Sequence, residues 1–165
     1  ETWVSSDSDE ILKFAKKFGA NIIKRPKSLA TDKSTSESAI LHFLENVDCD
    51  ILVFIQPTSP MILSNDINLG LKKIKRYDSV ISVSELHQFV WNGSKPSYDI
   101  NDRKRRQDNK KQYIETGSFF IISKNNFIKY KNRIGGTVGF IKIDRWRSFD
   151  IDTYEDLKIV RKLLR

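Results

Sequence analysis

Two carboxylates, separated by one residue, are the pair in this sequence best placed to do chemistry. Asp150 and Asp152 stand just before a predicted C-terminal helix at 153–165. Alternate side chains of an extended segment point the same way, so these carboxylates would lie about 6–7 Å apart on one side. Such a pair can hold a hard divalent cation, with phosphate oxygens completing its coordination. The alternative is that the pair caps the helix and forms salt bridges with Arg145 or Arg147.

A polar turn follows the most apolar run of the chain. Residues 51–55, Ile-Leu-Val-Phe-Ile, are typical of a strand buried on both faces, and hence of a central strand in a parallel sheet. The next five residues hold two prolines, which cannot continue such a strand. In open α/β sheets the ligand binds just past the carboxyl ends of the strands. Gln56, Thr58 and Ser59 would then bind a polar ring or a phosphate, although a plain tight turn is the alternative.

A basic run at 103–111 lies inside a longer stretch, 85–116, that shows neither helical nor alternating periodicity. An excursion of this length within a compact domain is usually functional or an interface. The run is either a solvated loop or nucleic-acid patch, or a source of arginines that clamp a carboxylate or phosphate. Few aromatic residues are interleaved with the basic ones, which disfavours nucleic acid. Tyr113, Phe119 and Phe120 could stack on a ligand or partner chain, but such residues are more often core.

The composition describes one globular domain of moderate size. The chain has 165 residues, of which 39% are hydrophobic, enough to form a core. No apolar run approaches a membrane span and no signal-peptide pattern is present, so no membrane is expected. The single cysteine, Cys49, excludes an internal disulfide and predicts a reducing, cytoplasmic location. The net charge of +8 suits an anionic partner such as a nucleotide, a sugar acid or a nucleic acid.

The remaining pattern predicts strands that alternate with helices. Ile11, Ala15 and Phe18 recur at helical spacing and are predicted to form the buried face of the first helix. The last helix is predicted to be capped by Thr153, with Asp156 at its third position. Predicted strands cover residues 2–4, 20–23, 51–55, 79–84, 118–123 and 137–143, with helices after all of them except the fourth. This order predicts a doubly wound α/β sheet.

Short motifs run through nearly the whole chain in a fixed order. They occupy residues 3–11, 19–20, 25–26, 32–36, 56–60, 78–83, 105–108, 115–119 and 150–153. Each motif is modest, but their order and spacing together are specific. Through these motifs the sequence resembles the CMP-sialic acid synthetase family, the N-acylneuraminate cytidylyltransferases.

The resemblance implies an α/β, three-layer, Rossmann-like nucleotide-sugar-transferase fold with a mostly parallel sheet. It implies a single domain over residues 1–165 with a protruding dimerisation arm over about 85–116. Members of the family are enzymes that couple a nonulosonic acid to CTP, giving a CMP-sugar and pyrophosphate. The implied partners are CTP, a nonulosonic acid and a second copy of the chain, without nucleic acid or membrane. In the implied reaction the anomeric hydroxyl attacks the α-phosphorus, and Mg²⁺ neutralises the developing charge.

The resemblance also implies roles for the residues of the two polar segments. Asp150 and Asp152 match the metal-binding and catalytic pair, and Asp150 would act on the metal or on the attacking hydroxyl. Gln56 matches a glutamine that contacts the sugar acid. Thr58 and Ser59, in the same turn, are counted with it as substrate-binding residues.

Further implied roles concern the cytidine half and the arm. Three residues fall where the family holds the cytidine half of the substrate: Arg25, Ser34 and Thr35. The arm would bring Arg106, as a catalytic residue, and Tyr113 toward the sugar site of the neighbouring subunit. Thr116 stands where the family usually carries asparagine on the sugar side of the site.

One departure leaves alternatives open. Family members begin with a strand and a loop of the kind R-x-G-S-K…K-N, which cradles the CTP phosphates and has no counterpart in this sequence. At least one βα unit, roughly 30 or more residues, is therefore expected to be missing. Residues 1–165 alone are expected to show no or very low turnover. The alternatives to an enzyme are a non-catalytic remnant that serves only binding, and a nucleic-acid-binding domain with salt-sensitive affinity.

Overall fold

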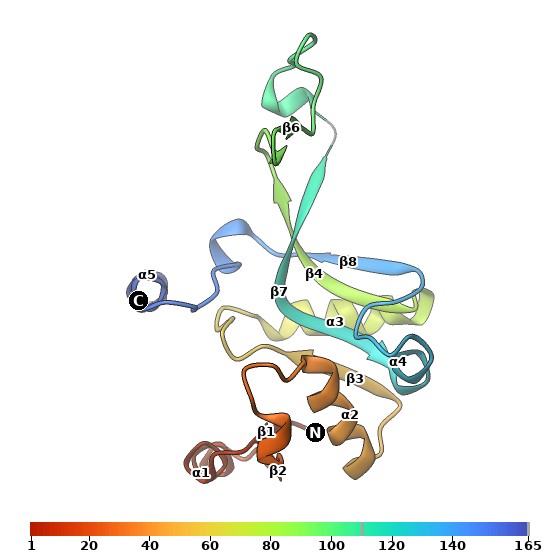
Figure 1. Cartoon of the computed structure of the whole chain (residues 1–165), viewed down its shortest axis with the longest axis vertical. Coiled ribbons are helices and arrows are strands. Elements are labelled where there is room, and N and C mark those ends of the chain that lie inside the picture. Colours follow the sequence, from red (N-terminus) through yellow and green to blue (C-terminus); the bar gives the residue numbers. More distant parts are fainter. Residues whose placement is uncertain (110, 165) are drawn as a thin grey trace.

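The computed structural model describes residues 1–109 and 111–164 (Figure 1). Strands are β1 Trp3–Ser6, β2 Asn21–Lys24, β3 Ile51–Ile55, β4 Ser79–Leu86, β5 Trp91–Asn92, β6 Lys95–Pro96, β7 Gln112–Ser123 and β8 Val138–Lys142. Helices are α1 Asp9–Lys17, α2 Ser36–Asn46, α3 Ser64–Lys73, α4 Lys124–Tyr130 and α5 Tyr154–Leu163. Two residues of predicted segments, Lys110 and Arg165, lie outside the described residues. The predicted alternation of strands and helices is confirmed.

The sheets differ from the expected arrangement in strand direction. The larger sheet has the order β3-β7-β4-β8, in which β7 runs antiparallel to β3 and β4, while β4 and β8 are parallel. Strands β1 and β2 form a separate parallel pair. Strands β3, β4 and β8 thus share one direction, as a mostly parallel sheet requires. Strand β7 lies between β3 and β4 and runs in the opposite direction. An apolar run records burial and not direction, so the sequence could not indicate this reversal.

Strand β7 forms the centre of the body, a place that the sequence analysis gave to residues 51–55. Four successive residues of β7, Phe119 to Ile122, are at most 1% exposed. Phe119 and Ile121 pack with α3 residues on one face, and Ile122 packs with α2 and α4 residues on the other. The sheet is therefore covered on both faces, which gives three layers. Strand β3 lies at the edge of this sheet, and its end residues Ile51 and Ile55 are exposed.

The buried face of α1 differs from the predicted one. Leu12 is buried, whereas Ile11 is 53% and Phe18 is 77% exposed. The helix packs on β1 and β2. Because this pair of strands is narrow, it covers the side of Leu12 and leaves the neighbouring side uncovered. Phe14 and Phe18 pack against each other there, with ring centroids 4.9 Å apart and ring planes tilted by 49°.

The excursion predicted at 85–116 is an arm that projects from the body (Figure 1). Its stem is the continuation of β4 and β7 beyond the body, paired from Val83–Glu115 to Leu86–Gln112. The pairing register shifts between Ile81 and Val83 of β4, which face Phe120 and Glu115 of β7, so the extra residues of this bulge lie in β7. The β5-β6 hairpin and a short 3₁₀ turn, η3 (Arg106–Asp108), complete the arm. Within residues 1–109 and 111–164, no helix is long and apolar enough to cross a membrane.

Candidate active site

Two loops meet past the carboxyl end of β3. One is the predicted turn at 56–60 and the other is the segment that precedes α5. The Ile151 amide donates to the Thr58 carbonyl oxygen at 2.9 Å. The hydroxyl of the buried Ser59 donates to the Asp150 carboxylate. The structure therefore brings together residues that are about 90 positions apart in the sequence, and it places them at the edge of the sheet where ligands bind.

Gly117 lies beneath this meeting point. Its φ of +69° is a left-handed conformation that glycine adopts without strain. A Cβ at this position would lie 3.0 Å from Gln56 Oε1 and 3.7 Å from Asp150 Oδ2. The amide of Gln56 and the carboxylate of Asp150 thus converge over a backbone position that has no side chain. We call Gln56, Ser59, Gly117 and Asp150 the carboxylate centre.

The second carboxylate, Asp152, lies on the exposed side of the same segment. Its amide donates to Asp156 Oδ2 at 3.2 Å. Capping of α5 is done by Thr153 and Asp156, as predicted, since each side chain accepts a hydrogen bond from the other's amide. The alternative in which the pair of carboxylates caps the helix and bonds to nearby arginines is therefore wrong. Among the described residues, Arg147 instead pairs with Asp66 and Asp144.

A separate pocket of about 260 Å³ opens at the carboxyl ends of β1 and β2. Its walls include all three residues predicted to hold the cytidine half: Arg25, Ser34 and Thr35. Arg25 Nε is buried and has no hydrogen-bond partner within the described parts of the chain. Ser34 Oγ lies 2.9 Å from Thr31 Oγ1, and Thr35 caps α2 by accepting from the Ser38 amide at 3.2 Å. The guanidinium of Arg25 is therefore the group best placed to bind a ligand here.

Other residues of this pocket were not predicted as site residues. Asp7 and Thr31 contribute to the wall. Asp7 lies in the motif at 3–11, directly after the end of β1. A polar residue immediately past a strand is the signal that would have identified it, because that is the position expected to face a ligand. Phe54 also lines the pocket. Because Phe54 lies two residues before Gln56, the end of one strand connects the pocket to the carboxylate centre.

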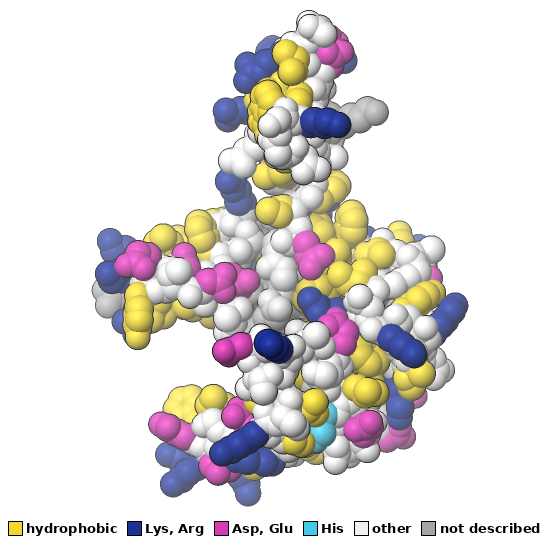
Figure 2. All heavy atoms as spheres, viewed as in Figure 1, with side chains coloured by type: hydrophobic (Ala, Val, Ile, Leu, Met, Phe, Trp, Pro, Cys, Tyr) yellow, Lys and Arg dark blue, Asp and Glu magenta, His cyan; other side chains and the backbone are white. Residues whose placement is uncertain are grey.

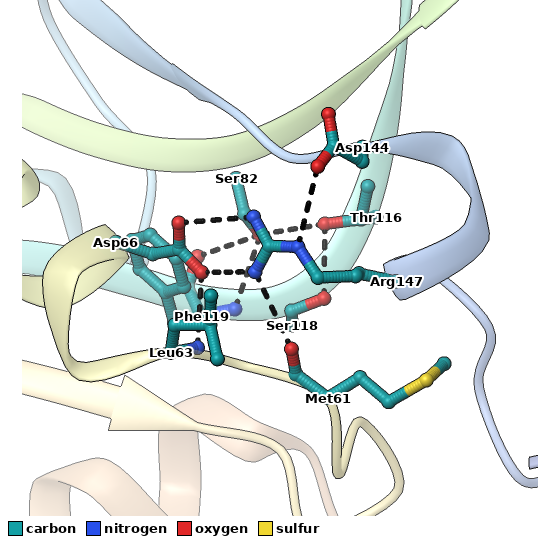
Figure 3. A network of polar contacts seen from close by, with 9 residues as sticks. All are labelled: Met61, Leu63, Asp66, Ser82, Thr116, Ser118, Phe119, Asp144 and Arg147. Carbon is teal, nitrogen blue, oxygen red and sulfur yellow. Dashed lines mark hydrogen bonds and ion pairs between the residues drawn. The ribbon is translucent and has the colours of Figure 1, made fainter. Parts of the chain in front are cut away.

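Thr116 does not offer its hydroxyl to a ligand. The side chain is buried, and Thr116 Oγ1 donates to Ser82 Oγ at 2.7 Å (Figure 3). Ser118 Oγ donates to Thr116 Oγ1 at 3.1 Å. Ser82 lies in β4 opposite the bulge of β7 and also accepts from the Phe119 amide at 3.1 Å. The predicted sugar contact through this hydroxyl is therefore not supported, because the hydroxyl belongs to a buried network between two strands.

The two predicted arm residues do not reach the carboxylate centre of their own chain. Arg106 is exposed in η3, with its guanidinium carbon 6.0 Å from the centroid of the Phe89 ring. Tyr113 lies in the stem, where its ring centroid is 5.6 Å from that of Phe140 and 5.0 Å from Lys142 Nζ. Figure 2 shows hydrophobic side chains exposed along the arm, with Lys and Arg side chains beside them.

Comparison with known proteins identifies the family. A family model described as "Cytidylyltransferase" matches residues 1–164. The chain belongs to the cytidylyltransferase family. It is 31% identical to N-acylneuraminate cytidylyltransferase B of Danio rerio and 28% identical to N-acylneuraminate cytidylyltransferase of Escherichia coli O18:K1:H7. These alignments cover 97% and 94% of this chain but 40% of each relative, so the chain spans about two fifths of their length.

Solved structures support the same fold. A CMP:2-keto-3-deoxy-manno-octonic acid synthetase complexed with CTP matches with a TM-score of 0.74 at 16% identity, over 99% of this chain and 80% of that one. A 4-diphosphocytidyl-2C-methyl-D-erythritol synthase from Anaerococcus prevotii matches with a TM-score of 0.67 at 13% identity, over 96% and 78%. The predicted α/β fold and the predicted family are confirmed.

The donor atoms of the carboxylate centre can be compared with the needs of a divalent cation. In the described residues no group of three or more His, Cys, Asp or Glu side chains could hold a metal ion alone. Asp150 uses one carboxylate oxygen to accept from Ser59, while its other oxygen faces the open position over Gly117. Mg²⁺ is commonly held by one or two carboxylates together with substrate phosphates and water. The Asp150 carboxylate fits this requirement, and the exposed Asp152, two residues later, is the second carboxylate predicted for it.

Proposed function

We propose that this chain is the cytidylyltransferase body of an enzyme that couples CTP to a nonulosonic, sialic-type acid. The products are a CMP-sugar and pyrophosphate. The observation that carries the proposal is the carboxylate centre, in which Gln56, Ser59 and Asp150 converge beside a polar pocket at the ends of the strands. The named relatives at 28–31% identity support the choice of a sialic-type acid. Residues 1–165 are taken as a single domain, and the predicted cytoplasmic location stays a prediction.

The pocket would hold the cytidine half of CTP. Arg25 presents a buried nitrogen without a protein partner, and a planar guanidinium donates well to the acceptors of a pyrimidine or a phosphate. Ser34 and Thr35 add hydroxyls to the wall, and the Asp7 carboxylate can accept from an amino group. Their position at the ends of β1 and β2 leaves the triphosphate free to extend toward the carboxylate centre.

The carboxylate centre would bind the sugar acid and perform the transfer. Gln56 offers an amide to the sugar, with Thr58 and Ser59 in the same turn. The anomeric hydroxyl oxygen forms a bond to the α-phosphorus of CTP, and the bond from that phosphorus to the bridging oxygen of pyrophosphate breaks. The proton of the hydroxyl passes to Asp150 or to solvent. We propose that Asp150 and Asp152 hold Mg²⁺, which would neutralise charge on the phosphates.

The arm would join two copies of the chain. Its exposed apolar residues include Trp91, Ile100 and Ile114, which a second copy would cover. In a two-fold dimer the same surface serves both subunits. Arg106 and Tyr113 lie on this arm and make no contact with Gln56 or Asp150 of their own chain within the described residues. We propose that they act at the site of the second copy, where Arg106 would bind the sugar carboxylate.

The test is a product assay on the protein expressed from its complete coding sequence. CTP, UTP, ATP and GTP are each offered with Mg²⁺ and a panel of nonulosonic acids, and pyrophosphate and nucleotide sugar are both measured. We expect pyrophosphate release with CTP and one or a few acids, in amounts equal to the CMP-sugar formed. If a folded protein released no pyrophosphate with any acid of the panel, or preferred another nucleotide, the proposal would be contradicted.

A further inference from the structure

Arg147 is a buried cation that none of the proposed steps uses. Its side chain is 9% exposed and that of Asp66 is 7% exposed. Nη1 donates to Asp66 Oδ2 at 2.5 Å and Nη2 donates to Asp66 Oδ1 at 3.2 Å, as the two dashed lines between them in Figure 3 show. This is a bidentate fork, which fixes both the distance and the orientation of the two groups.

The same guanidinium joins two segments of the chain. Nη1 also lies 3.4 Å from the Met61 carbonyl oxygen, and Asp66 accepts from the Leu63 amide at 3.0 Å. These contacts anchor the stretch that follows the turn at 56–60. On the other side, Arg147 belongs to the short turn η4 (Arg145–Arg147), and its amide donates to the Asp144 carbonyl oxygen at 2.8 Å. The fork therefore links η4 to the start of α3.

The two linked segments carry the carboxylate centre. Met61 lies two residues after Ser59, and Arg147 lies three residues before Asp150. On the far side of Asp150, the Ile151 amide bonds to the Thr58 carbonyl oxygen at 2.9 Å. The segment that holds Asp150 is thus fixed at both ends against the loop that holds Ser59.

A buried ion pair contributes little net stability, so a role in fixing geometry explains the pair of Arg147 and Asp66 better. Removing two charges from water costs about as much as their attraction returns, so an apolar pair of similar volume is often equally stable. Burial by itself would raise the pKa of Asp66, but hydrogen bonds from Arg147 and the Leu63 amide outweigh it and hold the pKa below its ordinary value. What the fork provides, and an apolar pair does not, is a fixed register between η4 and α3.

We propose that Arg147 is a positioning residue, whose fork on Asp66 holds the Asp150 carboxylate against Ser59 and over Gly117. The inference rests on the proposed function, because positioning matters only if Asp150 takes part in the transfer. Arg147 itself touches neither reacting group. It acts through η4 and the two residues that connect η4 to Asp150.

The first measurement is hydrogen exchange at single amides, which needs no substrate. Arg147→Lys keeps the charge but loses the fork, so the Ile151 amide is expected to exchange roughly tenfold faster, while the Ile121 amide in the core does not change. Arg133→Lys is the matched control, because Arg133 forms another partly buried pair, with Glu37 at 2.5 Å. The control is expected to leave the ratio of Ile151 to Ile121 exchange as in the wild type. An unchanged ratio in Arg147→Lys would overturn the inference.

A double variant separates positioning from stability. Arg147→Met combined with Asp66→Leu removes both charges and leaves neither unpaired, so the protein is expected to fold. Loss of Ile151 protection in this folded protein would support the inference, and full protection would overturn it.

The kinetic measurement uses both Arg147→Lys and the double variant. We expect kcat to fall at least tenfold with KM for CTP unchanged, because the pocket of Arg25 lies apart from η4. A wild-type kcat in both variants would contradict positioning. If the wild-type protein itself has no cytidylyltransferase activity, the proposed function fails, and the exchange measurement still decides whether the fork holds the Asp150 segment.

Discussion

Gly117 is a residue at which one added atom, a Cβ, would crowd the candidate site. Its φ of +69° lets the chain pass directly beneath Gln56 and Asp150. The absence of a Cβ leaves room there for the amide and the carboxylate to face a common point. The chemistry of the centre therefore depends on a residue that has no functional group of its own.

Gly117→Ala is expected to lower kcat and to destabilise the fold by about 1–2 kcal/mol, since a Cβ disfavours a left-handed backbone. The new methyl group would also lie 3.0 Å from Gln56 Oε1. Gly19→Ala is the control, because Gly19 has a φ of +81° but no atom within 4 Å of the built Cβ. Urea denaturation should show similar losses in both variants, and steady-state kinetics should show a fall in kcat only for Gly117→Ala. An equal kcat in the two variants would refute the crowding argument.

Arg25→Lys is expected to raise KM for CTP about tenfold, because a charged hydrogen bond from a planar guanidinium is lost. KM for the sugar acid should stay constant, since the acid would bind at Gln56. Arg105→Lys on the arm is the control, because this arginine is exposed and its side chain donates to the exposed Asp108 at 2.8 Å. Steady-state kinetics with each substrate varied in turn provides the check. A rise in the sugar KM alone would place Arg25 on the other half of the substrate.

The placement of side chains could be predicted where backbone position decides it, and could not be predicted where orientation decides it. The roles of these side chains stay predictions. Gln56 and Ser59 were identified because a turn past an apolar strand faces the ligand side of a sheet, and Asp150 because it is one of two closely spaced carboxylates before a helix. Thr116 was assigned to the sugar, but its hydroxyl bonds to Ser82 at 2.7 Å. That bond depends on the bulge in β7 that contains Thr116, and a bulge arises from the pairing of two distant strands. No local pattern in the sequence records it.

Among the secondary-structure elements, the turn η4 and the start of α3 depend on a buried carboxylate. Burial by itself raises the pKa of Asp66, but hydrogen bonds from Arg147 and the Leu63 amide, together with the charge of Arg147, hold this pKa below its ordinary value. A group whose pKa is lower in the folded protein stabilises the fold above its unfolded pKa, about 3.9 for aspartate. This contribution is lost as the pH falls through the lowered, folded-state pKa.

Asp66→Asn is therefore expected to cost about 3–5 kcal/mol at pH 7, because Arg147 is left buried without its partner charge. The difference from wild type should be constant between about pH 5 and 7 and should shrink below about pH 4, where Asp66 becomes protonated in the unfolded chain. Urea denaturation of both proteins across this range measures it. Asp144→Asn, at an exposed carboxylate 3.6 Å from Arg147 Nε, is the control and should cost far less. If the difference in unfolding free energy between the wild type and Asp66→Asn grew as the pH fell, Asp66 would not be stabilising the fold through its charge.

Elements were predicted where their signals are local. The cap of α5 by Thr153 and Asp156 is confirmed, because capping needs residues only three positions apart. The buried face of α1 was wrong, since Leu12 faces inward and Ile11 does not. Helical spacing indicated an apolar stripe, but the part of a stripe that becomes buried depends on the width of the sheet beneath it.

For the whole molecule, the order of strands was the least predictable feature. The order β3-β7-β4-β8 places a late strand between two earlier ones and reverses its direction. Apolar content marked both residues 51–55 and 118–123 as buried strands but did not rank them by position. The fold class was nevertheless correct, because alternation of strands and helices is sufficient to define it.

Mixing two inactive variants tests the proposed dimer. Arg106→Ala and Asp150→Asn should each lose activity, whereas their mixed dimers would contain one intact site built from the two unaltered halves. Random exchange of subunits in a two-fold dimer should restore about a quarter of wild-type activity. Activity assays after mixing and refolding, with sedimentation to establish the dimer, provide the measurement. No recovery from confirmed mixed dimers would mean that Arg106 does not act across the interface.

The central claim is that the Asp150 carboxylate, held by Ser59 over Gly117, takes part in cytidylyl transfer. The most direct test is the kcat of Asp150→Asn, which keeps the shape and a hydrogen-bond acceptor but removes the charge. Asp48→Asn, at an exposed carboxylate paired with Lys124, is the matched control. The account predicts that kcat falls at least about 100-fold in Asp150→Asn alone, with CTP affinity unchanged. A kcat like that of the wild type in a folded Asp150→Asn protein would contradict it.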